Sequence, residues 1–346
     1  MYQLFVKDLA NDRIYELPYS SLSFIEELNK GSDARFSLDY LAVEEIADKY
    51  STDPLFVFSG GKREIWIQKE GTKIFYGLVS DFQINKNESG ETNISVAAVD
   101  FITILSKRRT GAKREFSATD AGLIAWTLID ESQDSDPYYS DLGITQGTIQ
   151  TSVDRDRTFR FADIQYEIWQ MSNENLKNGF DFGINTSKQF NVYYPTKGSQ
   201  RENIYFDDQN ILSWEYRKPL IMSLTNKVHV LGEGVNDDRI YETRTSSTTY
   251  RETFGLLEGI LSETDVKESQ TLQDRGDKFL EDNQAPLVQL TIRHEDGAPD
   301  ILDYEVGDSL KINLPELDID NSYKRVYKRT IDIDGSQKAV ISLSLK

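Results

Sequence analysis

Carboxylates are the side chains of this sequence best placed to do chemistry. Asp100 stands where the strand-like run 94–99 meets the helix-like run 101–107, and an acid at such a joint can be aimed into a cleft. Other acids that could pair or cluster are Asp81, Asp134, Asp136 and Asp141. A glycosidase needs two carboxylates at a fixed separation, however, and among 58 acidic residues close pairs arise by chance. The sequence therefore predicts no enzyme, and no catalytic residue is assigned.

Thiols and imidazoles are too few for most metal or nucleophile chemistry. The chain has no Cys and only two His, His229 and His294, both in strand-like runs. Thiolate sites are thereby excluded, and no nucleophile elbow or metal-ligand spacing is present. The acidic runs 318–322 and 332–335 could form a calcium-binding loop, because calcium prefers several oxygen ligands. The run 332–335 is better explained as a hairpin turn with Gly335 at positive φ. We expect no cofactor and no metal.

A structural role accounts for Asp100 and for the basic residues after it. A short acidic side chain before a helix accepts hydrogen bonds from the free N–H groups of the first turn. Lys107, Arg108 and Arg109 would then lie at the negative end of the same helix. The basic stretch 106–115 could also bind nucleic acid or an acidic partner surface, but a solvated linker between modules is favoured.

The composition is that of a folded, acidic protein. Of 346 residues, 38% are hydrophobic and 11% aromatic, more than disordered chains carry, and the length predicts two to four modules. The formal net charge of -19 disfavours specific nucleic-acid binding, which depends on clustered Lys and Arg. No apolar run approaches the ~20 residues that cross a bilayer, and the N-terminus lacks the order of a signal peptide. We expect a soluble chain with no membrane-spanning segment.

Strand patterns dominate the first part of the chain. A hairpin is expected over 21–41, and a three-stranded meander follows with strands at 63–69, 73–84 and 92–99. Short antiparallel strands at this spacing favour a small barrel over a doubly wound sheet. Residues 1–110 are therefore assigned to a first β-barrel domain.

The middle of the chain is predicted to contain helices, and the part after residue 200 is predicted to consist mainly of strands. Residues 111–200 are assigned to an α+β middle domain with helices over 118–133 and 163–176, the first opened by a capping box from Ser117 to Asp120. Residues 201–346 are assigned to a second β-barrel domain, with a long strand region over 240–254 and a helical insertion around 263–284. The predicted fold class is mainly β with an α+β insert between two small barrels.

Aromatic residues could serve either the core or an interface. The four tryptophans could stack on sugars or bases, but their apolar neighbours favour core positions. They are Trp66, Trp126, Trp169 and Trp214. Tyr138 and Tyr139 stand beside Pro137 in a polar loop. They are the better interface candidates, because aromatic side chains are enriched at the centres of interfaces.

Several stretches resemble a known family. Three stretches resemble the first barrel of phage tail hub (baseplate hub) proteins of the Gp37-like family. They are "LNKGSDARFSLDY", "KIFYGLVSDFQI" with its internal Gly77, and "VAAVDFITILSKR". "LGITQGTIQ" with "RTFRFADIQYEIWQMS" is similar to the middle part of that family, and the end of the chain from "LDYEVGDSLKINLP" to "KAVISLSLK" resembles its last barrel. The resemblance covers nearly the whole chain in order.

The resemblance implies a structural protein at the tip of a phage tail. It implies a homotrimer whose two barrels per chain form a pseudo-sixfold ring, docked on a hexameric tail tube or distal tail protein. Further implied partners are the tape measure protein and a tail fibre, spike or receptor-binding protein. The expected location is the virion, after synthesis in the host cytoplasm. A carbohydrate- or receptor-binding tail module, or a carboxylate-based glycan hydrolase, stays open as an alternative.

The end of the chain bears on this resemblance. Many relatives continue past the last barrel into a peptidoglycan-degrading or receptor-binding extension, whereas this chain stops at Lys346, directly after the final expected strand. We expect either a short hub or a chain cut at that point.

Overall fold

The chain folds into two compact units. A computed structural model describes residues 1–346 except 10–11, 58–62, 137–139, 174–178, 219–220, 236–237, 264–265, 287 and 298. Unit 1 comprises Met1–Ser172, Phe180–Trp214 and Ile292–Leu345, and unit 2 consists mainly of Glu215–Thr291. The predicted boundaries at residues 110 and 200 both fall inside unit 1, and the division into three domains stays a prediction.

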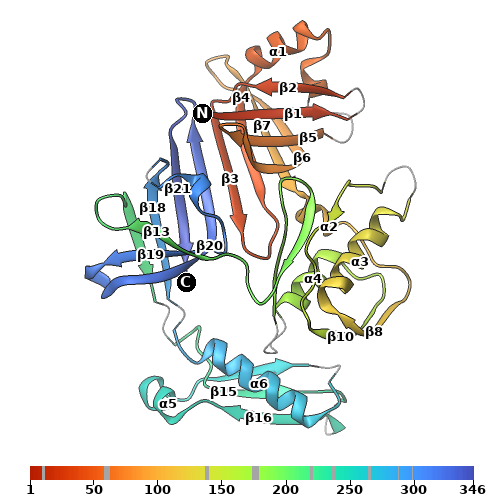
Figure 1. The fold of residues 1–346 in the computed structure, drawn as a ribbon, viewed down its shortest axis with the longest axis vertical. Coiled ribbons are helices and arrows are strands. Elements are labelled where there is room, and N and C mark those ends of the chain that lie inside the picture. Colours follow the sequence, from red (N-terminus) through yellow and green to blue (C-terminus); the bar gives the residue numbers. More distant parts are fainter. Residues whose placement is uncertain are drawn as a thin grey trace. The chain divides into compact units, whose positions relative to one another are not determined.

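The first part of unit 1 is a strand meander with two short helices (Figure 1). Gly77 lies inside one of its strands, where a Cβ atom would come within 2.1 Å of the Val99 carbonyl oxygen. Only glycine permits so close an approach of neighbouring strands. The elements are β1 (Tyr2–Asp8), β2 (Arg13–Leu17), β3 (Ser21–Glu27), β4 (Asp33–Asp39), α1 (Tyr40–Lys49), the helical turn Pro54–Val57, β5 (Arg63–Lys69), β6 (Thr72–Lys86), β7 (Thr92–Asp100) and α2 (Phe101–Leu105).

The middle part of unit 1 packs two helices against short strands. The buried face of its second helix carries Ile164, Ile168 and Met171, as their spacing predicts, and these side chains join a core with Phe182 and Phe190. The elements are β8 (Arg114–Asp120), α3 (Ala121–Gln133), β9 (Thr145–Gln146), β10 (Asp154–Phe159), α4 (Ile164–Ser172), β11 (Asp181–Ile184) and β12 (Gln189–Tyr193).

The last strands of the chain join the first ones in a single large sheet. Their elements are β13 (Gln200–Phe206), β14 (Ser213–Arg217), β18 (Gln289–Glu295), β19 (Ser309–Leu314), β20 (Ile319–Asp334) and β21 (Ala339–Leu345). The sheet has 13 strands, and its main path runs β14-β18-β21-β20-β3-β4-β7-β6-β5-β1-β2. The joint is the antiparallel pair β20–β3, in which Ile331 lies opposite Phe24 (Figure 1). Both ends of the sequence thus belong to one hydrogen-bonded layer.

Alternation along β3 and β20 places their buried side chains on one face of the sheet. Leu22 and Phe24 of β3 are buried, as are Ile331 and Ile333 of β20, while the residues between them are more exposed. Period-two burial of this kind is what an antiparallel sheet with one covered face requires.

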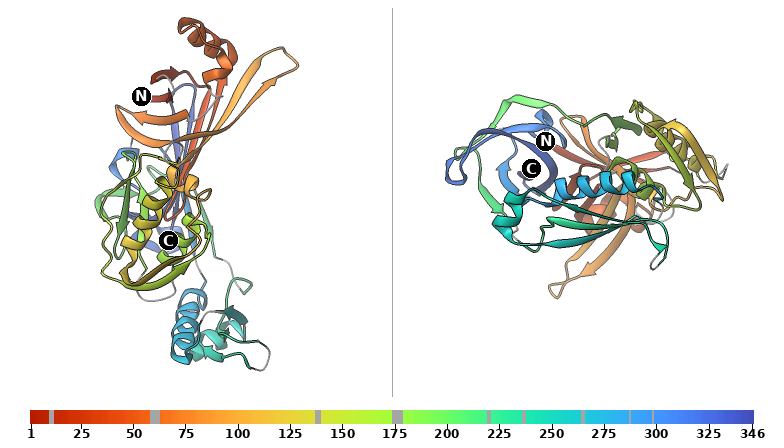
Figure 2. Two further views of the ribbon diagram at one scale, coloured as in Figure 1. Left: turned by 90° about the vertical axis from the view of Figure 1, so that its right-hand side faces the viewer. Right: turned by 90° about the horizontal axis from the view of Figure 1, so that it is seen from below.

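Unit 2 is a three-stranded sheet covered by one helix. β15 (Lys227–Leu231) is central, antiparallel to β16 (Tyr241–Thr245) and parallel to β17 (Glu258–Ser262), with α5 (Thr248–Phe254) between the two edge strands in sequence. The helix α6 (Ser269–Asn283) lies along one face of this sheet (Figure 2). Its Gly276 allows this contact, because a Cβ atom there would lie 2.8 Å from a methyl carbon of Val230. The core is small: Val228, Val230, Val266, Leu272 and Leu280.

Two predicted elements differ in the structure. The first helix of the middle part begins at Ala121, not at 118, and Asp120 is its N-cap, whereas Ser117 belongs to a strand and donates a hydrogen bond to Asp156. The capping box prediction was wrong because the strand β8 runs directly up to the cap. The expected strand over 240–254 splits into β16 and the helix α5, which buries no side chain and so lacks the periodic apolar face that marks a helix in sequence.

Two single-residue predictions also need correction. Trp214 is not a core residue, since its side chain is 40% exposed, whereas Trp66 is buried and Trp126 and Trp169 are half-buried against the middle core. In the turn between β20 and β21 the positive φ belongs to Gln337 and not to Gly335. The turn is held instead by the Asp334 carboxylate, which accepts hydrogen bonds from the backbone N–H groups of Ser336 and Lys338.

Candidate functional site

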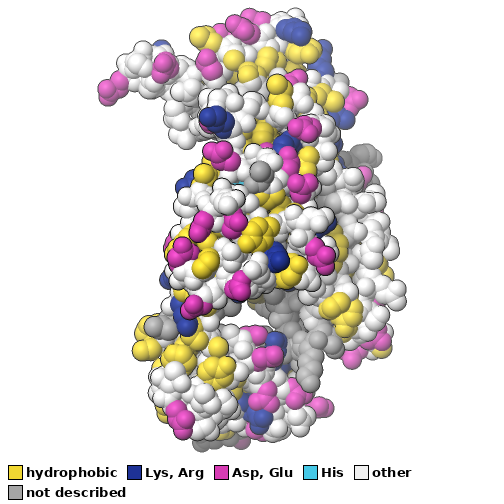
Figure 3. Space-filling model, turned by 60° about the vertical axis from the view of Figure 1, so that its left-hand side comes forward, with side chains coloured by type: hydrophobic (Ala, Val, Ile, Leu, Met, Phe, Trp, Pro, Cys, Tyr) yellow, Lys and Arg dark blue, Asp and Glu magenta, His cyan; other side chains and the backbone are white. Residues whose placement is uncertain are grey.

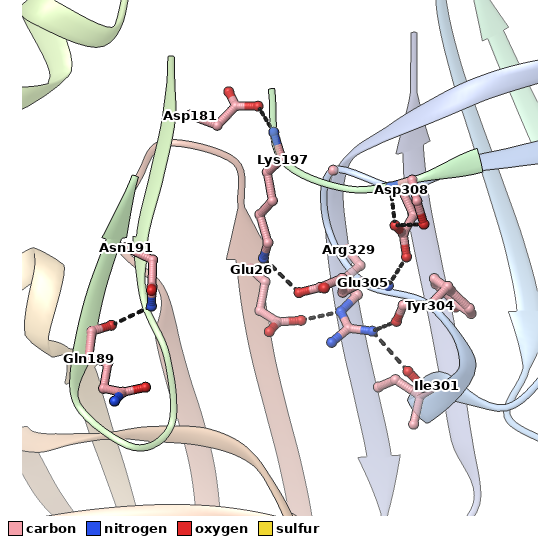
Figure 4. Close-up of polar contacts among 12 residues, drawn as sticks. Glu26, Asp181, Gln189, Asn191, Lys197, Ile301, Tyr304, Glu305, Asp308 and Arg329 are labelled. Carbon is pink, nitrogen blue, oxygen red and sulfur yellow. Dashed lines mark hydrogen bonds and ion pairs between the residues drawn. The ribbon is translucent and has the colours of Figure 1, made fainter. Parts of the chain in front are cut away.

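Arg329 is the centre of a buried ionic junction in unit 1. Its side chain is 6% exposed and lies on β20 directly opposite Glu26 of β3, with which it forms an ion pair. The guanidinium also donates hydrogen bonds to the carbonyl oxygens of Ile301 (3.0 Å) and Tyr304 (2.7 Å), as Figure 4 shows. One cation thus ties the seam β20–β3 to the loop before β19. Its hydrogen bonds compensate for the loss of water around a buried charge.

Asp181 forms a second junction, which attaches the middle part of unit 1. It is the first residue of β11 and is buried. Its carboxylate accepts hydrogen bonds from the Asn29 amide (2.8 Å), from the Lys197 backbone N–H (2.6 Å; Figure 4) and from Arg325 of β20. Asn29 returns the contact, because its amide oxygen accepts from the Phe182 N–H at 2.9 Å. Three segments far apart in sequence meet at this one carboxylate.

Asp308 is fully buried and fixes the turn that leads into β19. Its carboxylate accepts hydrogen bonds from the backbone N–H groups of Ser199 (2.7 Å) and Glu305 (3.0 Å) and from Arg201 (2.7 Å). Nearby, Lys197 pairs with Glu305 at 2.8 Å (Figure 4). A carboxylate that satisfies several N–H groups in this way holds two loops in one geometry.

Lys69 links the first strands to the segment after β18. Its buried ammonium lies 2.5 Å from a carboxylate oxygen of Asp296 and 2.5 Å from one of Asp300. The Tyr2 hydroxyl donates to Asp296 as well, at 2.5 Å. Burial would raise the pKa of Asp296, but the hydrogen bonds from Lys69 and Tyr2 outweigh it, and the pKa lies below its usual value. The carboxylate is therefore ionised at neutral pH.

Asp100 is the N-cap residue of α2. Its carboxylate accepts a hydrogen bond from the Thr103 N–H at 2.8 Å, and its own N–H donates to the Ser32 carbonyl at 2.9 Å. Burial raises the pKa of Asp100 to about 6, although hydrogen bonds from Thr103 and Ser32 favour the ionised form. The site is tight: a Cβ atom on Gly31 would meet Thr103 Oγ1 at 1.9 Å. Asp100 therefore joins the β3–β4 turn to the start of α2.

The basic residues after α2 contact the middle part of unit 1. Arg108 donates a hydrogen bond to the Ser140 carbonyl at 2.9 Å. Arg109 donates to the Ser106 carbonyl at 2.7 Å and pairs with Asp163 at 3.1 Å, while Lys107 is exposed. The two arginines thus fasten the linker to the segment that follows it. Tyr138 and Tyr139 lie outside the described residues.

Asp81 and Asp100, the first pair of acids considered for catalysis, lie on opposite faces of their sheet. On β6, Asp81 lies opposite Ala97 of β7, three residues before Asp100, so alternation sends the side chains of Asp81 and Asp100 to opposite faces. Asp134 ends α3 as its C-cap, and Asp141 accepts a hydrogen bond from the Gly143 N–H. In the part of the chain that the structure describes, no group of three His, Asp or Glu residues is placed to hold a metal ion.

His294 is the more buried of the two histidines. Its Nδ1–H donates to the Glu295 carbonyl at 2.8 Å, and Nε2 lies 2.7 Å from the Tyr304 hydroxyl. Burial lowers the pKa of His294, so the ring is neutral in the folded protein at neutral pH. Both ring nitrogens are engaged, which favours a packing role in the same loop that Arg329 holds.

Sequence reasoning missed the buried ion pairs, although one signal was present. Arg329 stands at the inward parity of β20, in register with the buried Ile331 and Ile333. Asp8 likewise continues the buried series of β1 and pairs with the buried Arg63. A charged residue on the apolar side of an alternating strand predicts a buried partner, because an unpaired buried charge is too costly. The identity of each partner required the fold.

Comparison with known proteins places this fold among tail proteins. No family model matches the chain, and no curated protein matches its sequence. A tail protein from Neisseria meningitidis shares the fold with a TM-score of 0.70 at 13% identity, covering 100% of this chain and 96% of that one. The 43 kDa tail protein of prophage MuSo2 from Shewanella oneidensis gives 0.69 at 11% identity, covering 99% and 97%.

The likeness extends to secretion machinery. The E. coli c3393 protein, a component of the type VI secretion system, matches with a TM-score of 0.54 at 8% identity, covering 95% of this chain and 73% of that one. At such identities the likeness shows the fold alone. Among the described residues, no helix is both long and apolar enough to cross a membrane. The chain is mainly β and has the fold of phage tail and baseplate hub proteins.

Proposed function

We propose that this chain is a structural subunit of a phage tail tip, a baseplate hub protein of the Gp37-like kind. Three copies form a ring around the tail channel, and each copy contributes two β-rich regions of similar shape, so that the ring offers six similar surfaces. The ring docks on the hexameric tail tube or distal tail protein and carries a fibre, spike or receptor-binding protein on its other side. The chain acts by geometry and not by catalysis.

The observation that carries this proposal is the extent of the fold likeness. Two tail proteins, one of them from a prophage, match over essentially the whole of this chain and of their own chains, which leaves little of either fold unaccounted for. A local likeness of one barrel would support far less, because small β-barrels serve many functions.

The build of unit 1 suits a ring subunit. Its first and last strands share one sheet, and Arg329, Asp181 and Lys69 tie segments from across the sequence into a single body. A ring that transmits load at a tail tip needs subunits that keep their shape. Buried, fully hydrogen-bonded ion pairs specify one arrangement of the segments they join.

The net charge suits a channel through which DNA passes. With a net charge of -19 on each copy, a ring of three copies repels a polyanion as a whole, which would keep DNA from binding as the tape measure protein and then the genome move through. Localisation in the virion, host attachment and DNA ejection follow from the same proposal.

The molar mass in solution tests this proposal. Sedimentation or light scattering across a concentration series should show a species of three times 39.7 kDa, either alone or after the distal tail protein is added. A monomer that does not associate under either condition and binds host-wall glycans would replace the hub with a carbohydrate-binding module. Hydrolysis of those glycans by the purified chain would replace it with an enzyme.

A further inference from the structure

The strand β17 is an open edge of the sheet in unit 2. In the part of the chain that the structure describes, β17 pairs only with the central strand β15, and its middle residue Ile260 lies opposite His229. Figure 3 shows that hydrophobic side chains reach the surface of this unit. Ile260 itself is 70% exposed. An open edge of this kind presents backbone groups with which another strand can pair.

The hydrogen bonds to β15 show which backbone groups of β17 point outward. The Leu257 carbonyl accepts from the Lys227 N–H at 3.1 Å. At the other end of the strand, the Glu263 N–H donates to the Leu231 carbonyl at 2.7 Å. Successive residues of a strand direct their backbone groups to opposite sides, so the odd-numbered residues of β17 face β15. The outward N–H and C=O groups are those of Glu258, Ile260 and Ser262.

β17 lacks the features by which edge strands usually avoid pairing. Such strands carry several charges, a Pro or a bulge, or they are very short. β17 has no Pro and no bulge against β15, and both strands have five residues. Its one charged residue is Glu258, at the first position. The opposite edge strand β16 carries Glu242 and Arg244, and Arg244 is paired with Asp277 of α6. Of the two edges of this sheet, β17 is therefore the one open to pairing.

We propose that β17 is a docking edge, at which an extended segment of an unlike protein adds a fourth strand to the sheet of unit 2. The outward backbone groups select this kind of ligand, because an extended backbone matches donors and acceptors that recur at every second residue. The proposal goes beyond the ring proposed above and does not depend on it, since the ring is a contact between copies of this chain.

The side chains of the docking edge indicate what the docked segment carries. On one face, the added strand would place a side chain beside Ile260, and an aliphatic residue there would remove apolar surface from water. On the other face lies Leu261, which packs against the core of unit 2 but is only partly buried. The helix α6 packs mainly on β15 and β16, so an aliphatic residue beside Leu261 would extend this core.

Charge favours an unlike, basic segment over a second copy. The chain carries a net charge of -19, so its long-range field attracts a basic segment and repels another acidic chain. At the docking edge, Glu258 pairs with Lys227 at 2.7 Å but its side chain is still 45% exposed. A Lys or Arg opposite Glu258 would stabilise the pairing, as opposite charges on neighbouring strands do. The docked segment is therefore aliphatic at its centre and basic at the end that meets Glu258.

A synthetic peptide tests the proposal on the full chain. The probe is a blocked heptapeptide with three central Val residues, flanked by Thr on one side and by Lys at both ends. The control peptide carries N-methyl groups on two adjacent Val residues, which blocks both edges of its backbone. N-methylation should weaken binding at least about tenfold in fluorescence anisotropy, because it removes donors from the pairing. Hydrogen exchange should show new protection of the amides of Glu258, Ile260 and Ser262 when the probe is bound.

Two variants locate the binding on the edge. Ile260→Pro removes the central outward N–H of β17 but none of the donors to β15, and proline is tolerated at such edge positions. It should weaken binding of the probe at least about tenfold. Ile260→Thr keeps that N–H and suits a strand, so it should bind the probe within about fivefold of the wild type. Circular dichroism checks that both variants are folded, and if Ile260→Pro is not, the two peptides still decide.

Three results would overturn the docking edge. The first is a wild type without new protection at Glu258, Ile260 and Ser262 at about 1 mM probe, a concentration that populates even weak pairing. The second is equal binding of both peptides, or equal binding of the probe by the wild type and a folded Ile260→Pro. The third is self-association of the wild type that Ile260→Pro abolishes, which would assign the edge to a second copy. The first two results leave the mass expected of the ring unchanged.

Discussion

Among the described residues, the most deeply buried ion pairs lie in unit 1, and those of unit 2 are half-buried or exposed. In unit 1, Arg329, Lys69 and Asp308 are buried, and each reaches across to a segment distant in sequence. In unit 2, the pair of Arg244 with Asp277 is at least one third exposed on both sides, and Lys278 pairs with Glu281 and Asp282 of its own helix. The pair of Arg275 with Glu263, which joins α6 to the segment after β17, is half-buried. Buried ionic contacts therefore specify how unit 1 is assembled, whereas unit 2 depends mainly on a small aliphatic core, with half-buried or exposed ion pairs around it.

The largest expected effect is the loss of a buried cation. Arg329→Ala leaves Glu26 without its cation and two backbone carbonyls without donors, and should lower the free energy of unfolding of unit 1 by about 3–5 kcal/mol. Arg244→Ala removes an exposed bidentate pair in unit 2 and should cost less than about 1 kcal/mol. Urea unfolding of both variants measures the difference. If both variants lost the same free energy of unfolding, the proposed difference between buried ion pairs in unit 1 and exposed ones in unit 2 would be wrong.

The aliphatic core of unit 2 should respond separately from unit 1. Leu272→Ala empties part of a core of five residues and should cost about 2–4 kcal/mol. Because the large sheet does not share that core, calorimetry should show one transition moved to lower temperature and the other unchanged. The matched variant Leu343→Ala, in β21, should move the other transition. A single transition that moves as a whole in both variants would mean that the units unfold together.

The smallest predicted effect concerns pH and Asp100. Burial raises the pKa of Asp100 to about 6 in the folded protein, above its ordinary value of 3.8. Between these values the folded state holds a proton that the unfolded state releases, so this carboxyl stabilises unit 1 at low pH and the gain is lost as pH rises through about 6. Asp100→Asn should remove that pH dependence and keep the cap. Asp100→Ala should remove the pH dependence as well, and should be about 1 kcal/mol less stable than Asp100→Asn at both low and neutral pH, because it also loses the cap.

Urea unfolding at pH 5 and pH 7.5 checks this prediction. Glu258→Gln in unit 2 is the control, because the pKa of Glu258 is lowered by hydrogen bonds from Lys227 and His229 and its contribution is present throughout this range. An Asp100→Asn variant that keeps the full pH dependence of the wild type would assign it to other groups. His294 acts in the opposite direction, since burial lowers its pKa and charging it below about pH 6.5 destabilises unit 1.

Local sequence signals predicted much of the fold. The meander of β5, β6 and β7 has the expected strands because side chains alternate and glycines or polar turns separate them. Ile164, Ile168 and Met171 are buried at helical spacing, as predicted. Where the local signal was weak, prediction failed: α5 has no apolar face, and Ser117 mimicked a cap three residues before the true one.

Contacts between distant segments could not be predicted in the same way. Nothing in β3 or β20 alone states that they pair, because each would satisfy the same alternation beside any other strand. The charge at Arg329 indicated a buried partner, yet Glu26 is one of 58 acids and only the fold selects it. The candidate site could therefore be predicted only in part. The sequence indicates that Arg329 is a buried charge, but it does not identify Glu26 as the partner.

The claim that unit 1 is one rigid body made from three sequence segments can be measured directly. Native-state hydrogen exchange read by mass spectrometry follows the strands β3, β11 and β20 beside β15 and α6 of unit 2. The account predicts that β3, β11 and β20 exchange together as one slow set, and that β15 and α6 exchange faster. If β11 instead opened independently while β3 and β20 stayed protected, the junction at Asp181 would not bind the middle segment into the body, and the account would be contradicted.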